Sequence, residues 1–196
     1  MTRFADISRQ TNETDIRLRL DLDGAGQANL STGVGFFDHM LEAVARHGGL
    51  DLDVEAQGDL EQTGAHHTVE DVGIVFGRAL DEALADRAGI ARFGQATVPM
   101  DEARATAVID VSGRPLCVFE GEVPAGAIQA FDSDLAEEFL RAVANTAKLT
   151  LHVRIEAGTN AHHMVEAAFK AFARALRMAV AVEPGATDVP STKGLL

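Results

Sequence analysis

Two copies of a histidine-rich motif stand out in this chain. His66-His67-x-x-Glu70 lies in the first half, and His162-His163-x-x-Glu166 lies in the second. A histidine and a carboxylate one helical turn apart can hold a divalent metal ion together. Adjacent side chains on a helix point about 100° apart, so the two histidines of each pair are better placed to hold two different ions. The duplicated motif predicts paired metal sites, formed where two halves of the fold, or two subunits, meet.

A single motif of this kind is more often a hydrogen-bonded network or a solvated helix end than a metal site. Its recurrence in matching contexts favours duplicated metal-binding halves. His39, at an expected helix start, and His152, within an expected strand, complete two sets. The eight candidate ligands are His39, His66, His67, Glu70, His152, His162, His163 and Glu166. Nitrogen and oxygen donors without thiolate suit Mn, Fe, Co or Zn, and two six-coordinate ions with open positions favour Mn.

Composition limits the function classes. The chain has 196 residues, of which 46% are hydrophobic, as expected for a globular domain. Its net charge is −13 and no basic cluster is evident, which argues against nucleic-acid binding. No apolar stretch approaches the roughly 20 residues of a membrane span, and Met1 to Arg9 lacks the apolar core of a signal peptide. Because Cys117 is the only cysteine, no intramolecular disulfide can form, and we expect a cytoplasmic location.

The apolar spacing of the first half predicts strands and helices in alternation. Ile16, Leu18, Leu20 and Leu22 alternate with polar residues, and the following turn at 23–26 predicts a hairpin. The next elements are expected to be a helix from Phe37 to Gly48, a strand at 50–54 and a helix at 69–84.

The second half repeats this order. Strands at 103–111 and 115–121 are joined at Ser112-Gly113, and a strand at 149–156 lies between two helices. We expect Asp132 to cap the first of these helices and Asn160 to cap the second, which ends near Val182.

Residue identities also repeat. Met40 to Ala45 resembles Phe139 to Ala144, and Glu55-Ala56 matches Glu156-Ala157. The chain is therefore predicted to be an internally duplicated αβ unit of the α+β class, with a four-helix layer between two four-stranded, antiparallel-to-mixed sheets. Residues 1–196 form one domain of two pseudo-repeats, about 1–95 and 96–182, with an irregular, substrate-binding tail at 183–196.

Five collinear segments resemble one known family, the imidazoleglycerol-phosphate dehydratases of histidine biosynthesis. They are Phe36 to Asp51, His66 to Leu80, Ser112-Gly113-Arg114-Pro115, Asn160 to Arg177 and Ser191-Thr192-Lys193-Gly194. The resemblance covers nearly the whole chain, without the fused phosphatase region of some members. One mild departure is Gln62-Thr63-Gly64-Ala65, which replaces a more acidic approach to the first histidine pair and removes no ligand.

The resemblance implies a Mn-dependent hydro-lyase. It would convert D-erythro-imidazole glycerol phosphate to imidazole acetol phosphate and water in L-histidine biosynthesis, with two Mn²⁺ ions per chain. The family also implies a homo-oligomer of 24 subunits built from trimers, with metal sites shared between subunits.

The resemblance also implies residue roles. Glu13 matches the acid/base carboxylate, and His66, His67 and Glu166 complete the catalytic group. The residues implied in substrate binding are Glu13, His39, His47, Arg92, Arg114, Lys170, Ser191 and Lys193. We expect His66 and Glu70 to hold one ion with His152 and His163. By pseudo-symmetry, the other ion would have His162, Glu166, His39 and His67 as ligands.

The proposed chemistry fits these residues. The substrate has no carbonyl beside the C–H bond that breaks, so enolate chemistry is not open to it. Metal binding to one imidazole nitrogen would acidify the other ring N–H, and the resulting imidazolate can expel the adjacent hydroxyl to give a diazafulvene. A carboxylate such as Glu13 can then remove the proton whose loss gives the enol of the ketone product.

Two other functions are compatible with the same ligands. A dinuclear metallohydrolase would release phosphate from a phosphoester instead of forming a ketone. A metal-templated assembly protein would bind the ions without turnover. The sequence does not separate a site role for Glu102 from a purely structural one.

Overall fold

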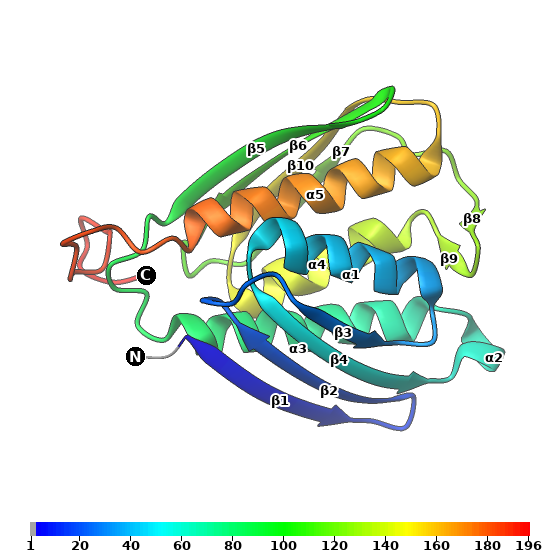
Figure 1. The fold of residues 1–196 in the computed structure, drawn as a ribbon, viewed down its shortest axis with the longest axis horizontal. Helices are drawn as coiled ribbons and strands as arrows, with labels where there is room; N and C mark the ends of the chain where they lie inside the picture. The colour runs from blue at the N-terminus through cyan, green and yellow to red at the C-terminus, as the bar shows by residue number, and fades with distance from the viewer. Residues whose placement is uncertain (1–2) are drawn as a thin grey trace.

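Two four-stranded sheets enclose a layer of four long helices in the computed structural model, which describes residues 3–196 (Figure 1). The elements of the first half are β1 Phe4–Gln10, β2 Thr14–Asp21, β3 Ala28–Ser31, α1 Gly35–Gly48, β4 Asp51–Gly58, the short α2 Leu60–Thr63, and α3 His66–Leu84. Those of the second half are β5 Phe93–Met100, β6 Ala103–Asp110, β7 Leu116–Glu120, β8 Ala127–Ile128, β9 Phe131–Asp132, α4 Leu135–Ala147, β10 Thr150–Ala157 and α5 Ala161–Ala179.

The two sheets have the same topology. Their strand orders are β1-β2-β4-β3 and β5-β6-β10-β7. In each sheet one pair of strands is parallel, β3 with β4 and β7 with β10, and a helix connects the two strands of that pair. The other pairs are antiparallel. This confirms the predicted α+β fold with two mixed sheets. The division near residue 95 stays a prediction, and β5 runs across it.

The core lies on both sides of the helix layer. Ile16, Leu18 and Leu20 of β2 point inward and are fully buried, whereas Arg17 and Arg19 between them are exposed. The helices of the two halves pack against each other, α1 on α5 and α3 on α4. Gly77 permits the close approach of α3 to α4, because a Cβ there would lie 2.0 Å from Thr146 Oγ1. Being sandwiched explains why these helices are apolar over so much of their surface.

The predicted hairpin after β2 is wrong. β2 pairs with β1, which precedes it, and the turn between them is at Thr11–Glu13. After β2 the chain leads instead into β3, which pairs in parallel with β4. The Asp51 side chain holds the connecting segment, since its Oδ1 accepts hydrogen bonds from the N–H groups of Ala25 and Gln27, each at 2.8 Å.

Two helix boundaries also differ from prediction. Asp132 lies in β9 rather than at a helix cap, and α4 begins at Leu135. Asn160 does cap α5, because its side chain accepts hydrogen bonds from the N–H groups of His162 and His163 at 2.9 and 3.4 Å. That helix ends at Ala179, and Val182 forms a bridge with Ile90 instead of continuing it. The apolar periodicity of 161–182 did not predict this end of the helix, because the bridge of Val182 joins it to a residue far away in the sequence.

The four long helices all begin at the same end of the molecule, on the right in Figure 1. The β1–β2 turn lies at this end as well, and both histidine motifs are in first helical turns. The C-terminal tail lies at the opposite end, beside the start of β5 and the β6–β7 connection. Within residues 3–196, no helix is both long and apolar enough to span a membrane.

Candidate metal centres and substrate site

Three predicted ligands meet between α1 and α5. His39, His162 and Glu166 each offer a ligand atom, and these atoms all lie within 4.8 Å of one another. Glu166 Oε2 is 3.1 Å from His162 Nε2 and 3.5 Å from His39 Nε2. The Glu166 side chain is only 6% exposed, whereas both histidines are nearly half exposed. Within residues 3–196, no other cluster of metal-ligating side chains is as close.

Lys170 favours the ionised form of the Glu166 carboxylate. Its Nζ lies 2.5 Å from Glu166 Oε1. Burial by itself raises the pKa of Glu166, but the Lys170 ammonium, followed by the neighbouring histidines, holds that pKa below its usual value. A pocket of about 220 Å³ opens beside Glu166 and is lined by His39, His47 and Lys170. Burial, then the positive charges of Lys170 and Arg174, lower the pKa of His47, so it is predominantly neutral near pH 7.

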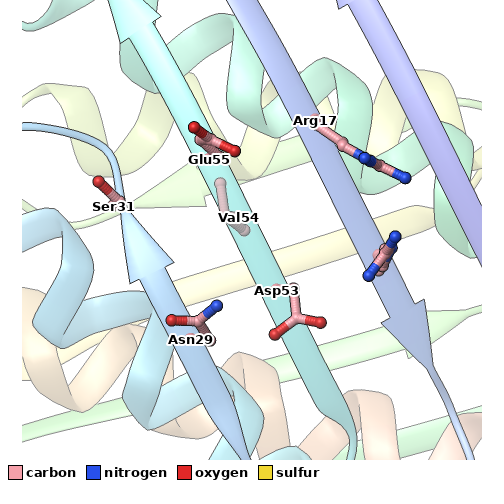
Figure 2. Close-up of a pocket in the computed structure, with 7 residues that line it drawn as sticks. Arg17, Asn29, Ser31, Asp53, Val54 and Glu55 are labelled. Atoms are coloured by element: carbon pink, nitrogen blue, oxygen red, sulfur yellow. The ribbon is translucent and has the colours of Figure 1, made fainter.

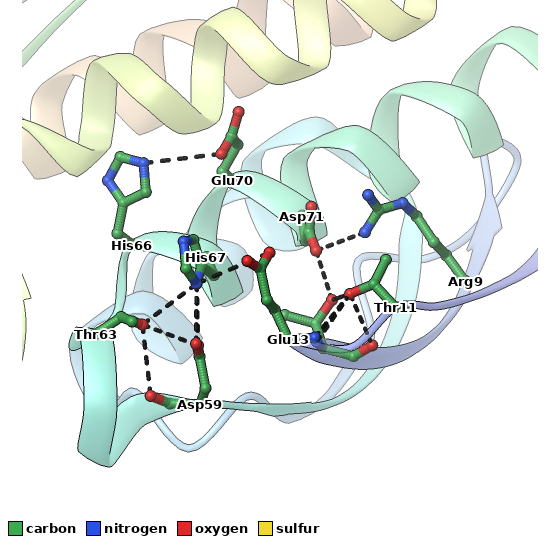
Figure 3. A network of polar contacts seen from close by, with 10 residues as sticks. Arg9, Thr11, Glu13, Asp59, Thr63, His66, His67, Glu70 and Asp71 are labelled. Carbon is green, nitrogen blue, oxygen red and sulfur yellow. Dashed lines mark hydrogen bonds and ion pairs between the residues drawn. The ribbon is translucent and has the colours of Figure 1, made fainter.

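The first motif divides its histidines between two directions (Figure 3). His66 turns toward Glu70, with 3.8 Å between Nε2 and Oε2, and both side chains are about half exposed. His67 turns the other way, and its Nδ1 lies 3.0 Å from Asp59 Oδ2 and 3.3 Å from Thr63 Oγ1. The hydrogen bond to Asp59 raises the pKa of His67. The divergence is that expected of adjacent residues on a helix.

Glu13 stands at the turn between β1 and β2, facing His67 (Figure 3). Its Oε2 is 3.9 Å from His67 Nδ1, beyond hydrogen-bond distance, and its side chain is 54% exposed. The turn is fixed by Thr11, whose Oγ1 accepts the N–H groups of Glu13 and Thr14 at 3.1 and 3.0 Å. The carboxylate of Asp71 holds the strand beneath it, at 2.5 Å from both Thr14 Oγ1 and Arg9 Nη1.

The second motif shows the same division. His162 turns toward Glu166, as described above, and its ring packs edge-on against Phe36, with 4.8 Å between centroids. His163 turns to Glu102, with 2.7 Å between Nδ1 and Oε2. The bond to His163, with backbone N–H groups of Asn160 and Thr159, lowers the pKa of Glu102 to about 2. Glu102 is therefore connected to a predicted ligand, which the sequence did not reveal.

His152 lies apart from the other candidate ligands. It is exposed on the outer face of β10, whereas the helices cover the inner face. Its cross-strand neighbours are Val108 on β6 and Val118 on β7.

The four remaining candidates lie at the tail end of the molecule. Arg92 forms two hydrogen bonds to the Asp110 carboxylate, at 2.7 and 3.2 Å, and donates a third to the Pro190 carbonyl at 2.8 Å. It therefore holds the tail in place. Arg114 is 67% exposed. Its guanidinium donates one hydrogen bond, to the Ser112 carbonyl at 3.3 Å, and lies 3.8 Å from Asp110 Oδ2, so most of its N–H groups remain open to an anion. Ser191 Oγ accepts the N–H of Lys193 at 3.2 Å in the turn that ends the tail.

The predicted site residues of one chain are thus divided between the two ends of the molecule. The end at which the four long helices begin, called the helix end, holds the group of three ligands. The opposite end, called the tail end, holds three cations and Ser191. Sequence reasoning missed Asp59 and Asp110, which bind the predicted residues His67 and Arg92, and Asp71, which holds the strand that follows Glu13. The sequence offered one signal for Asp71, its position one helical turn after His67 in an apolar helix. The structure shows it to be only 6% exposed, and a buried carboxylate requires partners.

Comparison with known proteins identifies the family. The family model described as "Imidazoleglycerol-phosphate dehydratase" matches residues 32–176. The chain belongs to this family. The imidazoleglycerol-phosphate dehydratase of Moorella thermoacetica is 54% identical over 196 residues, covering all of both chains. That of Gluconobacter oxydans is 53% identical over 196 residues, covering all of this chain and 98% of the relative.

Solved structures of the family agree with the fold. The imidazoleglycerol-phosphate dehydratase of Staphylococcus aureus has a TM-score of 0.83 at 40% identity, covering 91% of this chain and 99% of that one. The Pyrococcus furiosus enzyme, solved in complex with (S)-C348, has a TM-score of 0.83 at 37% identity, covering 97% and 100%. The chain is therefore an enzyme, an imidazoleglycerol-phosphate dehydratase and hence a lyase of histidine biosynthesis.

Proposed function

We propose that this dehydratase uses two Mn²⁺ ions per chain and completes each active site between chains of a 24-subunit assembly built from trimers. The observation that supports this most is the separation of the candidate residues. The helix end of the chain carries both histidine motifs and Glu13, and the opposite end carries Arg92, Arg114 and the tail. The 19-residue helix α3 runs from one end to the other, a span of about 28 Å. A substrate made of an imidazole ring, a three-carbon chain and a phosphate cannot touch both ends of one chain, so a second chain must supply one of them. The cytoplasmic location stays a prediction from the single cysteine.

The donor set fits a divalent ion. His39, His162 and Glu166 provide two imidazole nitrogens and a carboxylate oxygen around one point, and the two histidines are accessible from solvent. Three such ligands leave room for a further protein ligand and for substrate. In the proposed division, His67 completes this set. Within one chain His67 is not part of the group around Glu166, so a neighbouring chain would supply it.

The second ion would be held by His66, Glu70, His152 and His163. The ring geometry supports assigning the two histidines of a pair to different ions. His66 and His162 direct Nε2 toward a glutamate four residues on, whereas His67 and His163 direct Nδ1 toward other carboxylates. Only the first histidine of each pair is therefore placed to bind the same ion as the glutamate of its motif.

The two outer sheet faces differ in a way that fits a second copy on the His152 side. The first sheet presents charged and polar side chains around a pocket of about 220 Å³, including Arg17, Asp53 and Glu55 (Figure 2). Phe4 is the one large apolar side chain exposed on that sheet among the described residues, whereas Phe93, Val108 and Leu116 are exposed on the second sheet, at 60%, 41% and 49%. An exposed apolar patch around a predicted ligand is typical of a surface that another chain covers.

The residues of the chain divide the work of the dehydration. Bound metal would acidify the imidazole ring N–H and stabilise the departing oxygen. Glu13, half exposed and held by a fixed turn, would move the carbon-bound proton. Lys170 keeps Glu166 ionised as a ligand, and neutral His47 lines the same pocket. Arg114 and Lys193 would bind the phosphate dianion, while Arg92 holds the tail that presents Lys193.

Metal reconstitution with the substrate tests this proposal. Metal-free protein should be inactive, and Mn²⁺ should restore formation of the ketone product from imidazole glycerol phosphate. Elemental analysis should then give two ions per chain. Full turnover by rigorously metal-free protein, or release of phosphate without ketone, would contradict the proposal.

Arg114→Ala should raise the KM for substrate by roughly 10- to 100-fold, the loss of one charge-assisted contact to a dianion. The content of Mn²⁺ should stay at the wild-type value because Arg114 is not one of the eight proposed ligands. Steady-state kinetics and elemental analysis measure the two effects. Arg17→Ala is the matched control, since Arg17 is similarly exposed but pairs with Asp6 on the first sheet. An unchanged KM in Arg114→Ala would mean that Arg114 is an ordinary surface charge without a role in phosphate binding.

A further inference from the structure

The duplicated fold places a glutamate at the same point in each half. Glu13 lies in the turn between β1 and β2, and Glu102 lies in the equivalent turn between β5 and β6. Each turn faces the second histidine of the motif in its own half, His67 for Glu13 and His163 for Glu102. Topologically equivalent residues would be expected to have the same role, yet their contacts differ.

Glu102 is fully engaged. Its Oε2 is 2.7 Å from His163 Nδ1. Its Oε1 accepts the N–H groups of Asn160 and Thr159, at 2.9 and 3.1 Å, just before α5 begins. Both carboxylate oxygens are therefore already hydrogen-bonded, and the carboxylate is held in a fixed orientation.

Glu13 is not hydrogen-bonded to His67, because Asp59 makes the contact to His67 Nδ1 that Glu102 makes to His163 Nδ1. Both Asp59 oxygens lie within hydrogen-bond distance of His67 Nδ1, at 3.0 and 3.2 Å, and Thr63 Oγ1 donates to Oδ1 at 2.9 Å. Glu13 remains at 3.9 Å and half exposed (Figure 3). Asp59 directly follows β4, whereas Gly158 directly follows the equivalent strand β10.

We propose that Glu102 and Asp59 are positioning residues that fix the Nδ1–H tautomer of His163 and His67, and that Asp59 thereby frees Glu13 for proton transfer. Each carboxylate accepts the Nδ1–H, which leaves the Nε2 lone pair available to bind a metal ion. This inference rests on the proposed function, in which these two histidines bind metal. One duplicated position has thus acquired two roles: positioning in the second half and proton transfer in the first.

A glutamine at position 102 distinguishes positioning from simple packing. The backbone N–H groups of Asn160 and Thr159 require an acceptor, so the amide oxygen would face them. The amide NH₂ would then face His163 and donate to Nδ1. That donation forces the proton onto Nε2, the atom proposed to bind metal. Glu102→Gln therefore keeps the size of the side chain but inverts the tautomer, whereas Glu102→Asp keeps two acceptor oxygens.

The first readout is the tautomer in metal-free protein. Nitrogen NMR of protein labelled with ¹⁵N-histidine should show His163 and His67 protonated at Nδ1 in the wild-type chain. Glu102→Gln should move the His163 proton to Nε2, and Asp59→Asn should do the same to His67. The Glu137→Gln control should change neither ring, because Glu137 pairs with Arg141 rather than with a histidine. Wild-type rings protonated at Nε2 would overturn the inference.

The second readout is Mn²⁺ affinity, measured by competition with a chelator. Glu102→Gln and Asp59→Asn should weaken binding by roughly 10- to 100-fold, as for other carboxylates that orient metal-bound histidines. Glu102→Asp should recover part of the loss, and Glu137→Gln should bind as the wild type does. Wild-type affinity in Glu102→Gln would overturn the inference while leaving the proposed function intact. A wild-type chain that binds no divalent ion would refute the proposed metal sites, and the inference would fall with them.

Discussion

Glu13→Gln is expected to lower kcat by roughly 100- to 10,000-fold, the usual contribution of a general acid or base. Glutamine keeps the shape of the side chain but cannot accept the proton. The turn should remain in place because Thr11 Oγ1 holds the backbone N–H groups of residues 13 and 14. KM and Mn²⁺ content should therefore change little, and steady-state kinetics with elemental analysis will measure all three quantities.

Asp15→Asn is the matched control for this variant. Asp15 is an exposed carboxylate two residues further on, and Gln10 donates a hydrogen bond to it. It should retain wild-type kcat. If Glu13→Gln kept more than about a tenth of wild-type kcat, proton transfer by Glu13 would be wrong.

Removal of metal should break up the assembly. Ions held by ligands from two chains bind only when the chains associate, so metal binding and association must strengthen each other. A chain of 20.8 kDa gives about 500 kDa for 24 copies and about 62 kDa for a trimer. Size-exclusion chromatography with light scattering should find the larger mass with Mn²⁺ and the smaller one after EDTA treatment.

Glu70→Gln tests the same linkage without chelation. It removes one carboxylate ligand from the proposed site, and helix propensity is nearly unchanged. The large assembly should therefore require more Mn²⁺ to form. Glu82→Gln, near the far end of the same helix, serves as the control and should assemble like the wild type. The same mass with Mn²⁺ and with EDTA would mean that metal does not join the chains.

Local patterns predicted the elements well, because burial imposes its period directly on the sequence. The alternation of Ile16, Leu18 and Leu20 predicted a buried strand, and Asn160 was recognisable as a helix cap. Pairing partners were less accessible. The polar turn after β2 resembled a hairpin, but the chain there enters β3 and returns to the sheet through α1. A parallel pairing across a helix leaves no signature at the turn itself.

The site was predictable to the level of residue types but not of geometry. Duplication identified the histidine motifs, and the divergence of adjacent helical side chains predicted that each pair would separate. The carboxylates that orient those rings come from distant parts of the fold, as Glu102 does for His163. No sequence spacing relates such residues, since their proximity depends on how the strands are ordered in each sheet.

The most direct test asks whether two defective chains can restore each other. Glu13→Gln impairs the helix end and Arg114→Ala impairs the tail end, so the two variants would be coexpressed with different tags and mixed assemblies isolated. If each site takes its two ends from different chains, about a quarter of the sites in an equal mixture contain neither defect. At low substrate concentration, mixed assemblies should therefore recover about that share of wild-type activity. Activity no higher than the mean of the two variants alone would show that each chain forms its own site, and would contradict sites shared between chains.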